Sequence, residues 1–270
     1  MWKTAGLWLL ATGITLGSVV WQRLSGPTHP VSGSVSLGGT DIPVRLQRSH
    51  GGDGDQPVEL RVTDPQVSGE VAWRRYPTQE PWQVLALKRE GEALLAALPH
   101  QPPAGKLEFQ VRLRRGEESA VFPERPAVTR FKGEVHPALL IPHVILMFLG
   151  MLLSVRAGLA ALARERARRL CWLTLASLVA GGLVLGPAVQ AQAFGEWWTG
   201  WPVGHDLTDN KTALAAIAWA VAVALSRRQG KVARAVVMAA ALATLVVFAI
   251  PHSTWGSELQ WSEVPPAGLE

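Results

Sequence analysis

The stretch from Phe194 to Lys211 reads FGEWWTGWPVGHDLTDNK and separates two long apolar segments. It holds Trp197, Trp198 and Trp201 together with three glycines and several charged side chains, so it does not fit within the hydrocarbon of a bilayer. Tryptophan is enriched where lipid meets water. We therefore expect this stretch, the tryptophan loop (residues 194–211), at a membrane surface, where its rings either anchor the loop or line a ligand site.

A short repeat brackets the tryptophan loop. The tripeptide Ile-Pro-His occurs at residues 141–143, in the apolar segment before the loop, and again at residues 250–252, in the apolar segment after it. An imidazole near a membrane boundary either hydrogen-bonds a backbone carbonyl or ligates a metal. His143 and His252, in matching contexts around an aromatic loop, suggest one shared planar ligand.

The composition of the 270-residue chain is divided rather than uniform. Charged residues and prolines crowd residues 22–135, whereas apolar runs fill most of the remainder, which predicts a water-exposed part and a membrane part. The net charge of +5 does not indicate nucleic-acid binding, because much of the basic excess lies in two clusters beside apolar segments. These clusters are Arg156, Arg164, Arg166, Arg168 and Arg169, then Arg227, Arg228, Lys231 and Arg234.

Five apolar segments are predicted to cross a bilayer. Residues 1–24 read as a signal anchor, because residues 4–21 are uncharged and long enough to span about 30 Å when helical. A cleaved signal peptide is the alternative, although no A-x-A-like site is clear. The other spans are residues 137–155, 170–193, 212–225 and 235–250, which form a helical domain over residues 136–252. Gly181, Gly182 and Gly186 in the third span favour close helix contacts.

Residues 30–132 show a different pattern, in which apolar and polar residues alternate in short runs between clusters of Gly, Pro and Asp. The alternation predicts about seven antiparallel strands and an all-β sandwich of immunoglobulin-like architecture. Val71 and Trp73 are expected on its core face, and Arg112, Arg114 and Arg115 on a solvated face. The segment contains no nucleophile with a base and no cluster of metal ligands, so we expect a binding or docking module.

The basic clusters fix the predicted orientation, because cytoplasmic loops are rich in Lys and Arg. With a cytoplasmic N-terminus, five spans place both arginine clusters in the cytoplasm. The β-sandwich, the tryptophan loop and the tail over residues 253–270 then lie in the periplasm of a bacterial inner-membrane protein. This arrangement puts His143 and His252 in the same membrane layer as the tryptophan loop.

Two histidines from different helices are the axial ligands that b-type heme uses, with its apolar ring between them. His205 faces the same water layer, and Asp206 beside it could orient its ring. His136 is expected to contact headgroups. Thr208 or Asp209 is a candidate N-cap for the following helix, while Lys211 is a candidate partner for Asp206 or a heme propionate. Cys171 is the single cysteine, which excludes a C-x-x-C-H attachment of c-type heme.

The order of histidine-bearing span, span, tryptophan-rich external loop, span and histidine-bearing span resembles the heme-handling proteins of cytochrome c maturation. Their external loop carries a "WWD" motif of the approximate form W-G-x-x-W-x-W-D. The resemblance covers residues 137–255 and departs from the motif at Phe194, in the tryptophan spacing and in the insertion before Asp206. It implies heme ligation by His143 and His252, and a heme face resting on Trp198 and Trp201.

These observations predict an inner-membrane protein that binds heme b, either for heme handling in cytochrome biogenesis or for membrane electron transfer. The alternative is a non-catalytic accessory or assembly subunit that docks a periplasmic or membrane protein partner through its β-domain and binds no cofactor. Ion transport is disfavoured, because no charged residue lies well within a predicted span.

Overall fold

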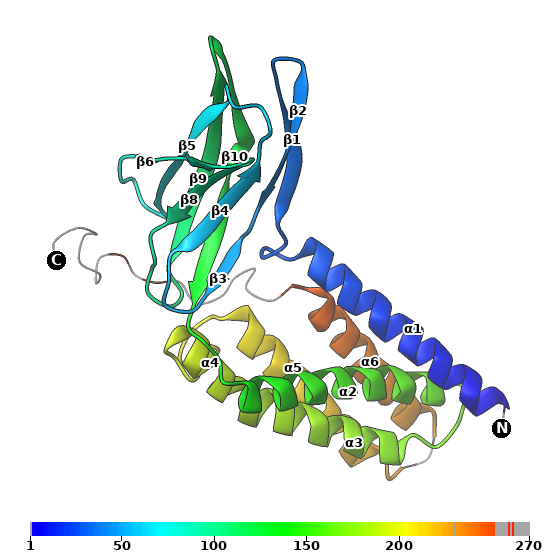
Figure 1. The fold of residues 1–270 in the computed structure, drawn as a ribbon. Coiled ribbons are helices and arrows are strands. Elements are labelled where there is room, and N and C mark those ends of the chain that lie inside the picture. The colour runs from blue at the N-terminus through cyan, green and yellow to red at the C-terminus, as the bar shows by residue number, and fades with distance from the viewer. Residues whose placement is uncertain (1, 229, 252–258, 260, 262–270) are drawn as a thin grey trace. The chain divides into compact units, whose positions relative to one another are not determined.

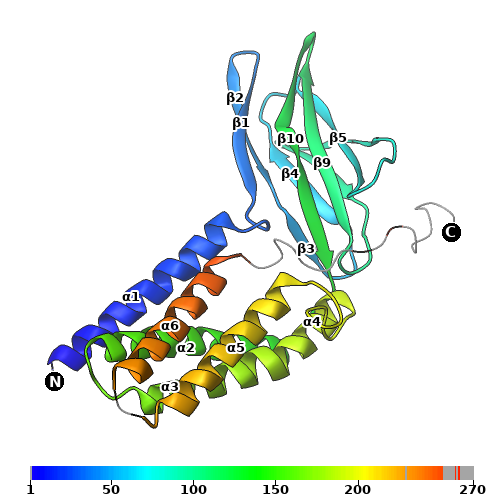
Figure 2. The ribbon, with the colours of Figure 1, turned by 180° about the vertical axis from the view of Figure 1, so that it is seen from behind.

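The computed structural model describes residues 2–228, 230–251, 259 and 261. The described chain divides into two compact units (Figures 1 and 2). A helical unit contains the residues up to Pro27 and those from Val135 to Pro251. A β unit contains Thr28–Glu134 together with Leu259 and Trp261. The β unit is thus an insertion between the first and second helices of the helical unit.

The helical unit consists of rods packed side by side (Figures 1 and 2). Its helices are α1 (Trp2–Ser25), α2 (Pro137–Leu162), α3 (Arg168–Leu178), α4 (Gly186–Phe194), α5 (Leu207–Leu225) and α6 (Lys231–Ala249). A π-helical segment, η1 (Val179–Leu185), joins α3 to α4. Trp219 of α5 is fully buried, and its Nε1 donates to Thr244 Oγ1 of α6 at 2.8 Å.

Four helices are long and apolar enough to cross a membrane: Lys3–Ser25, Pro137–Leu162, Arg168–Phe194 and Lys231–Ala249. The fourth predicted span does form a helix, α5, but it is not in this group. Its first turn carries Asp209, Asn210 and Lys211, which lower its mean hydropathy. The prediction of five transmembrane helices is therefore wrong.

Two of the three glycines of the third predicted span, Gly181 and Gly182, lie where helices approach closely, whereas Gly186 does not. A Cβ added to Gly181 would come within 2.8 Å of Leu146 Cβ in α2, and one added to Gly182 would overlap Thr212 Cγ2 in α5. The expectation that small residues permit close helix contacts is confirmed at both positions. The same glycines fall in η1, where the backbone departs from the α-helical hydrogen-bond pattern.

The β unit has ten strands in three sheets, not the two sheets of an immunoglobulin-like sandwich. Its strands are β1 (Val31–Leu37), β2 (Thr40–Leu46), β3 (Ser49–Gly51), β4 (Gln56–Arg61), β5 (Ser68–Arg75), β6 (Gln83–Ala86), β7 (Lys88–Glu90), β8 (Ala93–Leu98), β9 (Lys106–Arg115) and β10 (Glu118–Lys132). The sheet orders are β1-β2, β3-β10-β9-β5-β6 and β4-β8-β7. β3 pairs with β10 in parallel, whereas the prediction had only antiparallel strands. The immunoglobulin-like prediction is wrong, and the whole chain is a mixed α and β fold.

Alternation nevertheless identifies which side chains form the β core. In β9, buried residues alternate with less buried ones over most of the strand, and Phe109 and Leu113 are fully buried. Val71 and Trp73 of β5 both belong to the same core cluster, as predicted, with Trp73 only 4% exposed. The hydrophobic effect therefore accounts for the inward faces of the strands without dictating the order in which they pair.

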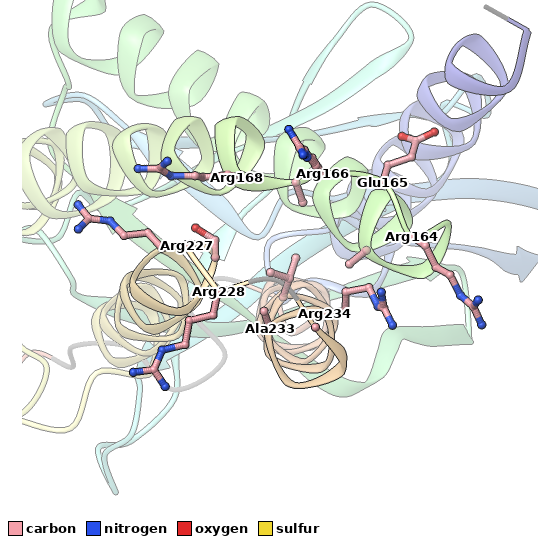
Figure 3. Close-up of a pocket in the computed structure, with 13 residues that line it drawn as sticks. Arg164, Glu165, Arg166, Arg168, Arg227, Arg228, Ala233 and Arg234 are labelled. Atoms are coloured by element: carbon pink, nitrogen blue, oxygen red, sulfur yellow. The ribbon is translucent and has the colours of Figure 1, made fainter.

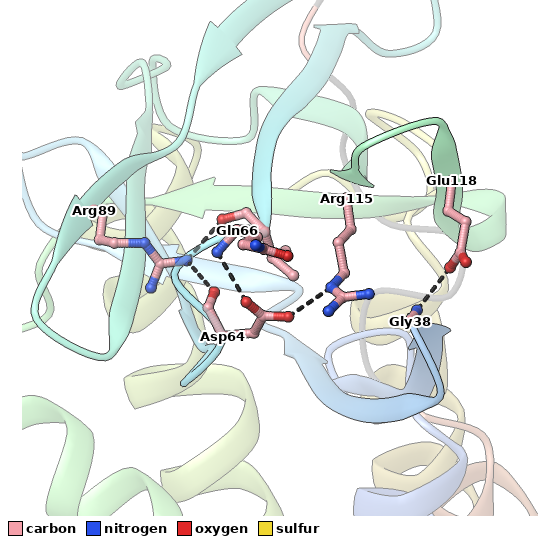
Figure 4. Close-up of polar contacts among 7 residues, drawn as sticks. Gly38, Asp64, Gln66, Arg89, Arg115 and Glu118 are labelled. Atoms are coloured by element: carbon pink, nitrogen blue, oxygen red, sulfur yellow. Dashed lines mark hydrogen bonds and ion pairs between the residues drawn. The ribbon is translucent and has the colours of Figure 1, made fainter.

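The arginines expected on a solvated face are partly engaged inside the unit. Arg115 Nε lies 2.7 Å from Asp64 Oδ2, and Asp64 Oδ1 accepts a hydrogen bond from the Gln66 backbone N–H at 2.8 Å (Figure 4). Arg89 donates to the carbonyls of Asp64, at 2.9 Å, and of Val67, at 2.7 Å. These contacts hold residues 62–67, the loop between β4 and β5.

Candidate functional site

The tryptophan loop connects α4 to α5 and presents two of its rings outward. α4 ends at Phe194, followed by Gly195 with φ of +86°, a left-handed conformation that glycine adopts without strain. Trp197 is 65% exposed and Trp201 is 75% exposed. Trp198 is half-buried, and its Nε1 donates to the Trp201 carbonyl at 3.1 Å. The three tryptophans are thus not equivalent, because only Trp198 is packed into the loop.

Asp209 is the acceptor that organises this loop. Its side chain is buried, and Oδ2 accepts from the Thr199 backbone N–H at 2.7 Å, the Gly200 N–H at 3.0 Å and Gln190 Nε2 at 3.2 Å. Asn210 Oδ1 accepts from the Trp201 N–H at 2.7 Å in the same manner. Side chains in the first turn of α5 therefore accept hydrogen bonds from three successive backbone N–H groups of the loop, residues 199–201. Burying such groups without an acceptor would lower the stability of the fold.

Asp206 caps α5. Its Oδ1 accepts from the Thr208 N–H at 2.7 Å, which identifies Asp206, rather than the predicted Thr208 or Asp209, as the N-cap. His205 beside it is exposed. Asp206 was predicted to lie in a ligand site, and the roles of Asp209 and Asn210 as acceptors for the loop were not predicted. The one sequence feature that points to this role is the pair of side-chain acceptors, Asp209 and Asn210, soon after a glycine-rich loop.

Lys211 joins the first turn of α5 to the end of α6. Its side chain is buried, and Nζ donates to the Ile250 carbonyl at 2.8 Å. This contact brings the residue before Pro251 to the same end of the helical unit as the tryptophan loop. His252 itself lies outside the described residues.

His143 of α2 bonds the π-helical segment. Its Nδ1 lies 2.8 Å from the Gly181 carbonyl oxygen, which can only accept, so Nδ1 carries the proton. In the tautomer with its proton on Nδ1, Nε2 is the nitrogen with a free lone pair. The half-buried ring lines a cavity of about 130 Å³ together with Gln22 of α1, Met147 of α2 and Phe248 of α6.

His136 has a local role. Its Nδ1 accepts from the Ala138 N–H at 3.2 Å and thereby caps α2, and its backbone N–H donates to Gln192 Oε1 of α4 at 2.8 Å. The predicted contact with headgroups stays a prediction. The start of α2 and the end of α4 therefore meet at the loop end of the helical unit.

The structure brings His143 and the predicted loop residues into one helical unit but into separate local environments. His143 contacts Gly181, whereas Trp198, Asp206 and Asp209 contact the loop itself. Among the described residues no group of three or more His, Cys, Asp or Glu side chains could hold a metal ion. Comparison with protein-family models, with curated proteins and with solved structures finds no match to this chain.

Proposed function

We propose that this chain is a membrane protein that binds b-type heme, for heme handling in cytochrome biogenesis or for membrane electron transfer, with His143 as one axial ligand. The observation that carries the proposal is the Gly181 carbonyl on Nδ1 of His143. Metal-ligating histidines usually donate their second ring N–H to a carbonyl or carboxylate, which fixes the tautomer and the ring orientation. His143 has that arrangement, with Nε2 as the nitrogen that would bind iron.

The proposed second ligand is His252, which directly follows Pro251, the last described residue after α6. Lys211 donates a hydrogen bond to the Ile250 carbonyl and so keeps this part of the chain at the loop end of the helical unit. A second imidazole that binds the same heme has to lie at this end. When bound, heme would supply a redox-active iron and an extended apolar ring. The surrounding residues would contribute by fixing the imidazole and excluding water.

The proposed orientation is a cytoplasmic N-terminus, with the tryptophan loop in the periplasm of a bacterium. It is supported by contacts within the helical unit. Arg156, near the arginine-rich end, lies 5.5 Å from the Trp8 ring of α1, whereas Gln22 of α1 donates to the Phe248 carbonyl near the end of α6 at 2.8 Å. The N-terminus is thus at the arginine-rich end, which the positive-inside rule assigns to the cytoplasm.

Absorbance spectroscopy of the full chain, purified in mild detergent, tests the heme proposal. We expect a reduced b-type spectrum in the wild type and loss of its low-spin form in His143→Gln, which keeps a donor for the Gly181 carbonyl but removes the imidazole. His136→Ala and His205→Ala are matched controls, because the first removes a helix cap and the second an exposed ring. The proposal fails if the His143→Gln variant keeps the wild-type spectrum.

A second candidate function, an accessory or assembly subunit without a cofactor, is favoured by two specific observations. The cavity beside His143 is about 130 Å³, whereas ligand pockets usually occupy roughly 300–1,000 Å³. In addition, Asp206 and Asp209 accept hydrogen bonds from backbone groups of the chain itself. In this alternative Trp197 and Trp201 anchor the loop in lipid, and the β unit docks a periplasmic partner. A wild type without heme would favour it.

A further inference from the structure

The arginine-rich end of the helical unit contains a cavity of about 270 Å³. It lies between the α2–α3 connection, the α5–α6 connection and the first turn of α6 (Figure 3). Two sequence clusters that are more than fifty residues apart therefore form one site. Six of its lining residues are arginines: Arg164, Arg166, Arg168, Arg227, Arg228 and Arg234.

The positive charge of this cavity is not balanced by its own carboxylate. Glu165 is the single acidic residue in the lining, and its Oε2 lies 3.0 Å from Nη2 of Arg156, a buried side chain of α2. In the part of the chain that the structure describes, none of the six lining arginines has a carboxylate partner within 4.0 Å. Six arginines around one cavity, without a carboxylate partner within the described chain, give it a positive potential, which favours an anion there.

Two helix N-termini add to the positive potential of the cavity. α3 begins after Ala167 and α6 begins after Gly230, and both of these N-cap residues line the cavity. Neither helix has a side-chain cap or an acidic residue in its first turn. Their first backbone N–H groups therefore remain available to an anion, and the helix dipoles favour negative charge there.

We propose that this cavity binds the phosphate of an anionic phospholipid headgroup. Guanidinium groups pair with phosphate through two parallel hydrogen bonds, and basic pockets between membrane helices suit anionic headgroups. Of the helices that are long and apolar enough to cross a membrane, Arg168–Phe194 and Lys231–Ala249 begin beside this cavity, and Pro137–Leu162 ends beside it. Leu162 and Val232, which are 69% and 72% exposed, flank the arginines and offer apolar surface to acyl chains. That surface favours a lipid over free phosphate.

Native mass spectrometry of the full chain in detergent tests this proposal by comparing added phosphatidylglycerol with phosphatidylcholine. We expect the wild type to retain phosphatidylglycerol preferentially. Each basic side chain near an anionic membrane surface contributes roughly 5-fold, so Arg168→Gln/Arg234→Gln should weaken the preference by about 25-fold. Arg168→Lys/Arg234→Lys should weaken it less, because it keeps the charge and loses only the planar fork.

The matched control is Arg169→Gln/Lys231→Gln, which removes the same charge from neighbouring positions that do not line the cavity. This variant should retain phosphatidylglycerol nearly as the wild type does. Equal losses in the two glutamine variants would overturn the proposal, because they would indicate diffuse surface charge. Equal retention of the two lipids by the wild type, with competition by inorganic phosphate, would also overturn it in favour of a free phosphate site. The test does not depend on heme.

Discussion

The two ends of the helical unit use charged side chains in opposite ways. At the loop end, Asp209 and Lys211 are buried, and each is hydrogen-bonded to backbone groups of the same chain. At the other end, six arginines line one cavity, and among the described residues none has a carboxylate partner. The first set of charges maintains the fold, whereas the second is available to something outside the chain.

This difference shows why residue type alone is a poor guide to function. The loop end has the composition of a ligand site, with tryptophans, a histidine and carboxylates, yet Asp206 and Asp209 accept hydrogen bonds from Thr199, Gly200 and Thr208. The arginine end has the composition of an ordinary cytoplasmic loop, yet residues of both of its clusters line one cavity. Whether a polar group already has a partner is what distinguishes the two ends.

The largest expected effect follows the loss of the Asp209 carboxylate. Asp209→Ala leaves the Thr199 and Gly200 N–H groups without their acceptor, and an unsatisfied buried donor costs about 1–3 kcal/mol. We expect the free energy of unfolding to fall by about 2–5 kcal/mol. Reversible unfolding of the purified protein in mixed micelles measures this change.

Glu196 provides the control for that prediction, because it is an exposed carboxylate in the same loop. Glu196→Gln should change the free energy of unfolding by no more than about 0.5 kcal/mol. If Asp209→Ala destabilised the protein no more than Glu196→Gln does, the loop-end charges would not maintain the fold, and the contrast between the two ends would disappear.

Part of this structure is predictable from local patterns, and part depends on distant partners. Alternation identified strands and a core containing Val71 and Trp73, because burial of one strand face is a local property. The parallel pairing of residues 49–51 with residues 130–132 is not local, since it joins segments about eighty residues apart. Hence the core could be predicted, whereas the sheet order could not.

The same distinction applies to the candidate sites. Both arginine clusters were visible in the sequence, but that residues of both line one cavity depends on how α3 and α6 pack. Asp209 was predicted to be a helix cap because it lies just before an apolar helix. Its actual donors come from residues 190, 199 and 200, on the preceding helix and loop, and no local pattern identifies them. Hydropathy indicated a span at residues 212–225 because the polar residues before it, which form the first turn of α5, were not counted in the span.

A smaller effect is expected at the arginine end. Arg168→Gln/Arg234→Gln removes two cations that have no carboxylate partner among the described residues, so no favourable ion pair is lost. The free energy of unfolding, measured in a zwitterionic detergent, should stay within about 0.5 kcal/mol of the wild type or rise slightly as repulsion is relieved. A loss comparable to that of Asp209→Ala would mean that these arginines serve the fold.

The smallest expected effect on stability concerns the Asp64 carboxylate of the β unit. It tests whether a hydrogen-bonded carboxylate matters less to the fold when it is exposed to water. Asp64 has partners, as Asp209 does, but it is solvent-accessible. The hydrogen bond from the Gln66 backbone N–H and the contact with Arg115 lower the pKa of Asp64 below its usual value. A carboxylate whose pKa is lower in the folded state stabilises the fold above its unfolded pKa, near 4, and loses that contribution as the pH falls through the folded pKa.

Chemical denaturation of residues 28–134, expressed alone, should therefore show a modest loss of stability below about pH 4. Asp64→Asn should reduce this loss, whereas Asp53→Asn, at an exposed position in another loop, should leave it unchanged. If Asp64→Asn lowered the stability at neutral pH as much as Asp209→Ala does, exposure to water would not distinguish these two carboxylates, and possession of a partner would be the only property that matters.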